Sequence, residues 1–422
     1  MRLHARIAKV TSTFGWLAMD TEQRRRMMEA VDQFRDETTV DDLGFGGIRD
    51  AFSDTLFPGT STLHTRLRYV LFIPWLLQLA AHQDNVSQMM SGFREYEYRL
   101  IESLQRGQES EGIIGRVAGR SLRSLPSTLY WGMITQWQIF EPGFTLRQYF
   151  ERELLRREEL RSAPRSDDPE VHLSLSPTGL DPRLPDPPEG LLKGANFPLQ
   201  PTEAQYLTET ITRTTAGSLL AHLVTHRPAT WTEESTAPTA AWDPAIRREL
   251  SPELDDLVDR AERFAITAQG ANLLYNLLLA EATGKQTRQG DSLTEVYTQR
   301  LLDWFDLTRE SAPLYAQDRG EVWQMVTARG RRLSRKTQEF IATWAEAVAE
   351  ASSVSDLTEN NLLRERIRAR EREKKGSRAR LAPGNQRALD AWTGASGTGL
   401  YEYRWSYVRS HLQDLYDAEP AL

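Results

Sequence analysis

The chain has 422 residues, of which 40% are hydrophobic and 26% charged, and its formal net charge is -7. This length and composition predict a globular protein with at least two hydrophobic cores, and they exclude fibrous, collagen-like and wholly disordered chains. The absence of cysteine excludes disulfides, thiolate metal sites and a cysteine nucleophile, and it is typical of a reducing compartment.

No segment of the sequence predicts a membrane span. The longest apolar stretch, Tyr69–Ala81, is interrupted by Pro74 and Gln78, whereas a span needs about 20 apolar residues. The N-terminal sequence also lacks the apolar core of a signal peptide. We therefore expect a soluble, cytoplasmic protein that makes no contact with membranes.

Helical periodicity runs through the first 163 residues. A capping-box pattern at Asp20 and Gln23 predicts the first helix, and apolar residues on one face predict a second over 48–56. A third helix is expected to begin at Thr60–Thr62 and to kink or end at Pro74. Three more helices are expected over residues 89–104, 126–137 and 146–161.

A proline-rich segment follows, because nine of the 20 prolines lie in residues 164–201. Such a density cannot continue a helix or occupy a central strand, so the segment is predicted to be a linker or an extended surface strap. Four segments are therefore expected: an N-terminal helical lobe over 1–163, the strap over 164–201, a central helical lobe over 202–355, and a C-terminal part over 356–422.

Helical patterning resumes after the strap. One helix is expected from Thr202 to about His226, and another from Glu253 to Ala282, with Gly270 as a point where it could divide. No sustained alternation typical of strands and no internal repeat is present. The predicted fold class is all-α, with two multi-helical lobes joined by the strap.

Charge is distributed unevenly along the chain. Residues 164–328 hold 14 basic and 25 acidic side chains, whereas residues 329–422 hold 17 basic and 13 acidic ones. Within the latter, residues 364–387 carry ten basic against three acidic side chains. A basic element on an acidic body is a candidate contact for a polyanion or a partner protein, and a solvated, salt-bridged helix end is the structural alternative.

A basic helix is predicted over 356–375, with Asp356 and Glu359 as its start signal. Its apolar positions stop at Ile367, so the second half is expected to project into solvent or onto a partner. No base-reading motif is present, so the expected contact is with the phosphate backbone, with a log–log salt slope of roughly -3 to -4. The predicted nucleic-acid-binding residues are Arg364, Arg368, Arg372, Lys374, Lys375, Arg378 and Arg380.

The segment 59–66 predicts an anion-binding site, because a helix N-terminus offers free N–H groups and the arginine would reinforce them. The alternative is a plain Ser/Thr cap, with Arg66 and Arg68 paired to Asp50 or Asp54 in a buried network. The predicted anion-binding residues are Gly59, Thr60, Ser61, Thr62, His64 and Arg66.

Two other motifs are better explained as structural. His222 and His226 are spaced as metal ligands on a helix, but the glutamate that a zincin needs is absent. The sequence GASGTG at 394–399 follows a helical segment and lacks the Lys-Ser/Thr of a phosphate loop, so a tight turn is predicted. We therefore expect no metal and no cofactor, and no catalytic residue is assigned.

Several strings resemble an uncharacterised bacterial family, a domain of unknown function. They are residues 14–77, from FGWLAMDTEQ to VLFIPWLL, together with STLYWGMITQW, ANLLYNLLLAE and GASGTGLYEYRW. The resemblance covers nearly the whole chain and carries over no catalytic residue. It implies genomic association with helicases, methyltransferases and nucleases in bacterial anti-phage defence clusters, which is an association and not a mechanism.

We therefore expect a non-enzymatic accessory or adaptor protein of an anti-phage defence system. It would contact nucleic-acid backbone, with DNA as the first candidate, and dock helicase, methyltransferase or nuclease subunits. One alternative is an enzyme or effector with a phosphate-handling site near Asp50, Asp54, His64 and Arg66. The other alternative is a pure assembly scaffold.

Overall fold

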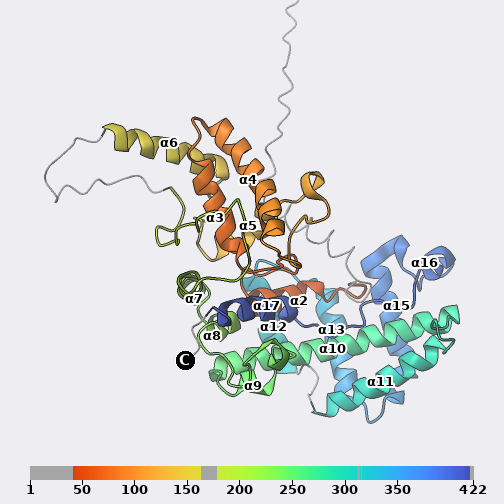
Figure 1. Cartoon of the computed structure of the whole chain (residues 1–422). Helices are drawn as coiled ribbons and strands as arrows, with labels where there is room; N and C mark the ends of the chain where they lie inside the picture. The colour runs from red at the N-terminus through yellow and green to blue at the C-terminus, as the bar shows by residue number, and fades with distance from the viewer. Residues whose placement is uncertain (1–40, 163–177, 311–313, 315, 419–422) are drawn as a thin grey trace, which may run out of the picture. The chain divides into compact units, whose positions relative to one another are not determined.

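The computed structural model describes residues 41–162, 178–310, 314 and 316–418 (Figure 1). These residues form helices and no strand, apart from two isolated β-bridges, so the predicted all-α class is confirmed. The helix predicted at Asp20 and Gln23 lies outside the described residues. In the described part of the chain, no helix has both the length and the apolar character that crossing a bilayer demands.

The described residues fall into two compact units. The first unit is built from residues within Gly59–Thr214 and Ser410–Leu422, and the second from residues within Glu29–Pro58 and Thr215–Arg409. Each unit is therefore assembled from segments that are distant in the sequence. The four segments predicted from the sequence have other boundaries, and they stay a prediction about how the chain divides under proteolysis.

The first unit is organised around α3 (Tyr69–Ala80), which packs against α4 and α5 (Figure 1). The ring of Tyr69 lies 5.2 Å from that of Tyr130 and 5.4 Å from that of Phe197, and all three are fully buried. The apolar run of α3 is thus the centre of the first unit's hydrophobic core. The other helices of this unit are α4 (Val86–Arg106), η2 (Gly119–Ser121), α5 (Pro126–Gln136), α6 (Leu146–Ser162) and α7 (Pro201–Thr214).

The predicted start of the third helix at Thr60–Thr62 is wrong, because α3 begins at Tyr69 and the preceding residues form turns. The backbone N–H of Arg66 donates to the Tyr130 hydroxyl (3.1 Å), and that of Leu67 donates to Asp414 Oδ2 (3.0 Å). Side chains from distant segments therefore satisfy backbone groups that a helix would otherwise bond. Pro74 does not end α3, which continues for six more residues to Ala80.

The described part of the proline-rich segment, from residue 178 onward, belongs to the first unit and runs through turns and irregular backbone. Trp75 Nε1 donates to the carbonyl of Pro185 (2.6 Å), and Ser103 Oγ donates to that of Leu191 (2.7 Å). Phe197 is fully buried. Residues 178–200 are thus in contact with the rest of the first unit, while residues 163–177 lie outside the described part, and the linker-or-strap prediction for 164–201 stays a prediction.

The second unit is organised around α10 (Pro252–Thr283), which packs along α11 and also contacts α2, α13, α15 and α16 (Figure 1). The other elements are α2 (Gly46–Leu56), α8 (Leu219–Leu223), η3 (Glu234–Thr236), α9 (Pro244–Arg247), α11 (Leu293–Glu310), α12 (Ala316–Ala328), α13 (Arg335–Glu350), α14 (Ser355–Thr358), α15 (Asn361–Lys375), η4 (Gly376–Arg378) and α16 (Gln386–Asp390). The helix α17 (Trp405–Tyr416) contributes its first residues to this unit and its last to the first unit.

Periodicity located most of the predicted helices correctly, and the predictions for α2, α4, α5 and α6 are confirmed. The single helix predicted from Thr202 to His226 is wrong, because α7 ends at Thr214 and α8 begins after Gly217 (φ +79°). The division of α10 at Gly270 does not occur. A Cβ at Gly270 would lie 2.1 Å from the indole of Trp304, so this glycine permits the close approach of α11.

The helix predicted over Asp356–Lys375 consists of two elements, α14 and α15. The side chain of Asn360 caps α15 by accepting hydrogen bonds from the N–H groups of Leu362 (3.0 Å) and Leu363 (3.2 Å). The carboxylate of Asp356 instead accepts from the backbone of Ser352 and Ser353 in the preceding loop.

Candidate functional site

The second half of α15, predicted to project into solvent or onto a partner, is exposed at Arg372 and Lys374 but buried at two positions. Arg370 and Glu371 are buried, with 3% and 0% of their surface exposed. The Arg370 guanidinium donates to the carbonyl of Leu43 (2.8 Å) and to Thr337 Oγ1 (2.9 Å), and it pairs with Glu373 (3.0 Å). The apolar positions of this helix stop at Ile367, and their absence beyond it predicted exposure. Polar partners from α13 and from the segment before α2 bury Arg370 instead.

Glu371 faces the long helix α10. Its carboxylate accepts hydrogen bonds from the Tyr275 hydroxyl (2.6 Å) and from the backbone N–H groups of Arg380 (2.7 Å) and Leu381 (2.9 Å). Three donors thus compensate the burial of this carboxylate and fix the chain that leaves α15.

Asp42 is the centre of a second buried group, with 1% of its side chain exposed. Its carboxylate accepts from Ser396 Oγ, pairs with Arg380 Nη1 (3.0 Å) and contacts the Lys375 ammonium. Burial, together with the nearby guanidinium groups of Arg380 and Arg378, lowers the pKa of Lys375 to about 7. Lys375 and Arg380, both predicted to bind nucleic acid, are therefore engaged inside the second unit.

The predicted nucleic-acid residues thus divide into paired and exposed ones. Arg364 pairs with Glu281 of α10, and Arg368 pairs with Glu365 (2.7 Å). Four cations of this region are instead exposed, and within the described part of the chain none of them forms an ion pair; we call them the exposed α15–η4 cations. They are Arg366, Arg372, Lys374 and Arg378.

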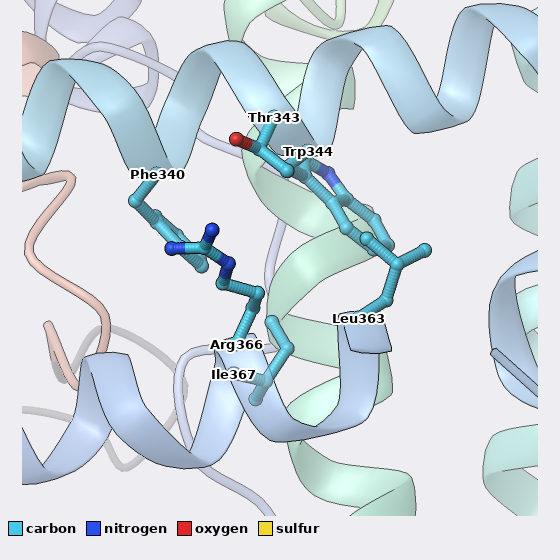
Figure 2. A pocket seen from close by; sticks show the side chains of 6 residues that line it. All are labelled: Phe340, Thr343, Trp344, Leu363, Arg366 and Ile367. Carbon is cyan, nitrogen blue, oxygen red and sulfur yellow. The ribbon is translucent and has the colours of Figure 1, made fainter. Parts of the chain in front are cut away.

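The helices α13 and α15 lie side by side, and their facing side chains leave a gap of only about 10 Å³ (Figure 2). Arg366 reaches across this gap from α15 toward Phe340 of α13. A gap of this size holds no ligand, so the interface is a packed support for the charges on its rim.

A second basic segment lies at the start of α13. Residues 329–336 carry five cations, and the chain has no acidic residue from 322 to 338. The side chains of Arg335 and Lys336 are 91% and 74% exposed, and Lys336 pairs with Glu373 of α15 (3.4 Å). The cation run is visible in the sequence, but its position beside α15 is not.

The predicted anion site loses its helix N-terminus, because α3 begins only at Tyr69. Thr60 and Ser61 are buried, and Ser61 Oγ accepts from the N–H of Leu63 (3.3 Å) in a local turn. Gly59 has φ +84° and lies against Trp137, and Thr62 is half-buried in the same turn. Anion binding by this segment stays an untested expectation without the geometry on which it was based.

Arg66 and His64 have partners within the first unit. Arg66 forms a two-pronged ion pair with Asp414 (2.7 Å) and stacks over Phe197 (4.8 Å). The buried His64 ring stacks on Tyr130 (4.3 Å), and its Nε2 lies 3.1 Å from the carbonyl of Leu129.

Asp50 and Asp54, by contrast, belong to the second unit, where both pair with Arg331 (3.2 and 3.0 Å) and Asp54 also pairs with Arg404 (2.9 Å). Arg66 and Arg68, the arginines of the structural alternative, pair instead with acidic residues inside the first unit. The alternative of an enzyme with a site near these residues stays a prediction.

Two further features carry no evident chemistry. The rings of His222 and His226 stack 4.5 Å apart, and among the described residues no group of three or more potential metal ligands occurs. A solvent-open hollow of about 600 Å³ beside α9 contains Arg247, whose guanidinium is held by Asp255 (2.6 Å), Asp259 (3.4 Å) and Glu262 (3.4 Å).

A family profile matches residues 11–419, and its description reads family of unknown function, DUF6361. The chain belongs to this family. The match covers nearly the whole chain, so both units are part of what the DUF6361 members share. No curated protein and no solved structure matches the chain significantly.

Acidification should destabilise the first unit of this DUF6361 protein through His411. Burial and the nearby Arg66 guanidinium lower the pKa of this imidazole to about 4, from 6.5. The native state therefore binds fewer protons than the unfolded state in that interval, and stabilisation present above pH 6.5 is lost as the pH falls through 4. We expect the parent to lose about 3 kcal/mol relative to a His411→Leu variant, measured by urea unfolding at pH 7 and pH 4.

The comparison with the variant is necessary because Glu97 acts in the opposite direction. Burial raises the pKa of this carboxyl to about 7, although the N–H of Ser127 donates to it (2.8 Å). Its contribution is present below pH 4.5 and is lost as the pH rises through 7. A Glu97→Gln background should thus steepen the loss on acidification. An equal loss in the parent and the His411→Leu variant would contradict the assignment.

Proposed function

We propose that this protein is a non-enzymatic accessory or adaptor protein of a bacterial anti-phage defence system. In this proposal the exposed α15–η4 cations contact nucleic-acid backbone, and the rest of the molecule docks helicase, methyltransferase or nuclease subunits. The defence association comes from the sequence resemblance alone.

One observation carries the proposed contact. The exposed α15–η4 cations lie within 13 consecutive residues and form no ion pair in the described part of the chain. Phosphate groups can therefore approach them without first displacing a carboxylate. Each phosphate contact would then release condensed counterions from the nucleic acid, which favours binding. Paired cations such as Arg364 would have to give up Glu281 first.

The same cations are better suited to contact the phosphate backbone of nucleic acid than its bases. Recognition of bases needs side chains placed along a groove with a defined donor and acceptor pattern. No helix-turn-helix, zinc-finger or other base-reading motif is apparent in the sequence. Binding independent of sequence follows from this, with partner proteins supplying any specificity.

The test measures the affinity for a fluorescent duplex of about 20 base pairs between about 50 and 200 mM salt. For the parent protein, a plot of the logarithm of the association constant against the logarithm of the salt concentration should have a slope of about -3 or steeper. Replacing Arg366, Arg372, Lys374 and Arg378 together by glutamine should weaken binding at 50 mM salt by at least about tenfold and flatten the slope by about 3. Sequence changes in the duplex should have little effect.

The matched control removes four exposed cations elsewhere, Arg123, Arg147, Lys193 and Arg248, so that net charge falls equally. It should retain affinity within about twofold. Reversal of Arg364 is unsuitable as a test, because a carboxylate there would face Glu281 and disturb α10. No binding by the parent at 50 mM salt, or equal losses in both variants, would leave docking of partner proteins as the function.

A further inference from the structure

We propose that the turn before α13, the first residues of α13 and the side of α15 next to α13 form one surface that binds the phosphate backbone of duplex nucleic acid. We call it the α13–α15 basic surface, and the inference rests on the proposed function. Its cations are Arg332, Arg335, Lys336, Arg366 and Lys374.

The two parts of this surface are held together by specific contacts. Lys336 pairs with Glu373 (3.4 Å), and Arg370 of α15 donates to Thr337 of α13 (2.9 Å). The Arg370 guanidinium also lies over the ring of Phe340 (5.5 Å). The facing side chains of α13 and α15, shown in Figure 2, leave a gap of only about 10 Å³. The backbone that carries these cations is therefore held in place, so binding has to order only their side chains.

The charges of the surface are accessible and only partly compensated. Arg332 is exposed, and no ion pair to it occurs among the described residues. Arg335 pairs with Glu339, but both side chains are largely exposed, at 91% and 56%, so a phosphate can displace the carboxylate at small cost. Lys374 lies over Gly44, where a Cβ would come within 2.7 Å of its methylene groups, so part of its stem is packed although the residue as a whole is exposed.

The composition of the surface favours a duplex over a single strand. Proteins that bind single strands combine basic grooves with exposed aromatic side chains on which bases stack. The largely exposed apolar side chains of the described residues are Val117, Leu155, Leu160, Leu302 and Leu362, and none is aromatic. The aromatic residues of α13, Phe340 and Trp344, are buried against α15. Contact with phosphates alone suits a duplex, whose bases are already stacked.

Glu339 gives the surface a built-in restraint that mutation can remove. Its carboxylate holds Arg335 at 2.7 Å across one turn of α13. Replacing Glu339 by glutamine leaves Arg335 available to phosphate and removes a nearby negative charge. We expect tighter duplex binding, by about two- to fivefold at 50 mM salt, and a slope steeper by up to about 1.

The decisive variant, which we call the turn variant, removes the cations of the turn before α13 and of the first turn of α13, and it leaves α15 unchanged. Replacing Arg332, Arg335 and Lys336 together by glutamine should weaken duplex binding by at least about fivefold and flatten the salt slope by about 2 to 3. The matched control replaces Arg123, Arg147 and Lys193, three exposed cations of the first unit. Thermal unfolding of each variant verifies that the second unit remains folded.

The outcomes separate this inference from the proposed function. If the turn variant binds like the control while the α15–η4 variant is weakened, the two-part surface is wrong and the proposed function stands. If neither variant is weakened relative to its control, both are wrong. A single strand of equal length that binds as tightly as the duplex overturns the duplex assignment. Tighter binding by Glu339→Gln together with loss in the turn variant supports the surface.

Discussion

Replacing Arg68 by methionine should destabilise the first unit by about 3–5 kcal/mol. The Arg68 guanidinium pairs with Glu203 at 2.6 Å, and only 3% and 4% of these side chains are exposed. It also donates to the carbonyl and the side chain of Asn196 (2.9 and 2.6 Å). Removing it leaves a buried carboxylate without its counter-charge, which costs more than the pair itself contributes. Urea unfolding followed by tryptophan fluorescence measures the loss.

A second change separates the loss of the charge from the loss of packing. In the double variant Arg68→Met with Glu203→Gln, no uncompensated charge remains, and the glutamine oxygen can still accept from the N–H of Gln200. We expect at least half of the lost stability to return. A cost below about 1 kcal/mol for Arg68→Met alone would show that solvent reaches Glu203 and that the pair is not buried.

The helices of this fold were predictable because apolar periodicity is a local signal. The wrong predictions, such as the helix start at Thr60–Thr62, have a common physical cause, which is hydrogen bonding between residues far apart in the sequence. Residues 60–68 are not helical because the N–H groups of Arg66 and Leu67 bond to Tyr130 and Asp414, 64 and 347 positions away. A periodicity analysis covers only the residues of one helix at a time, so it cannot include those partners.

The same limit applies to the candidate site. The lack of apolar positions predicted an exposed second half of α15. Two of its residues, Arg370 and Glu371, are nevertheless buried, and their partners include Leu43 and Arg380, which are distant from each other in the sequence. Conversely, the five cations of residues 329–336 could be read from the sequence. What the sequence did not contain is the contact between Lys336 and Glu373 that places those cations beside α15.

Charge reversal at two positions only two residues apart should have opposite consequences. Arg380→Glu is expected to cost the second unit about 3–5 kcal/mol, because its guanidinium serves a buried group. Arg380 Nη1 donates to Asp42 Oδ2 (3.0 Å), to Ser396 Oγ (2.9 Å) and to the Tyr275 hydroxyl (3.3 Å). A glutamate there would face Asp42 with a like charge and leave both hydroxyl groups short of a donor.

Arg378→Glu changes the net charge equally, but its side chain is exposed and has no ion pair among the described residues. The free energy of unfolding of the Arg378→Glu variant should stay within about 0.5 kcal/mol of the parent's. Its affinity for duplex nucleic acid should fall, as expected for loss of one of the exposed α15–η4 cations. Thermal unfolding and salt-dependent binding, measured on both variants, therefore distinguish cations that build the second unit from cations available to a ligand. Equal destabilisation by Arg378→Glu and Arg380→Glu would contradict this division. It would mean that η4 is held by the summed charge of the region and not by the group around Asp42.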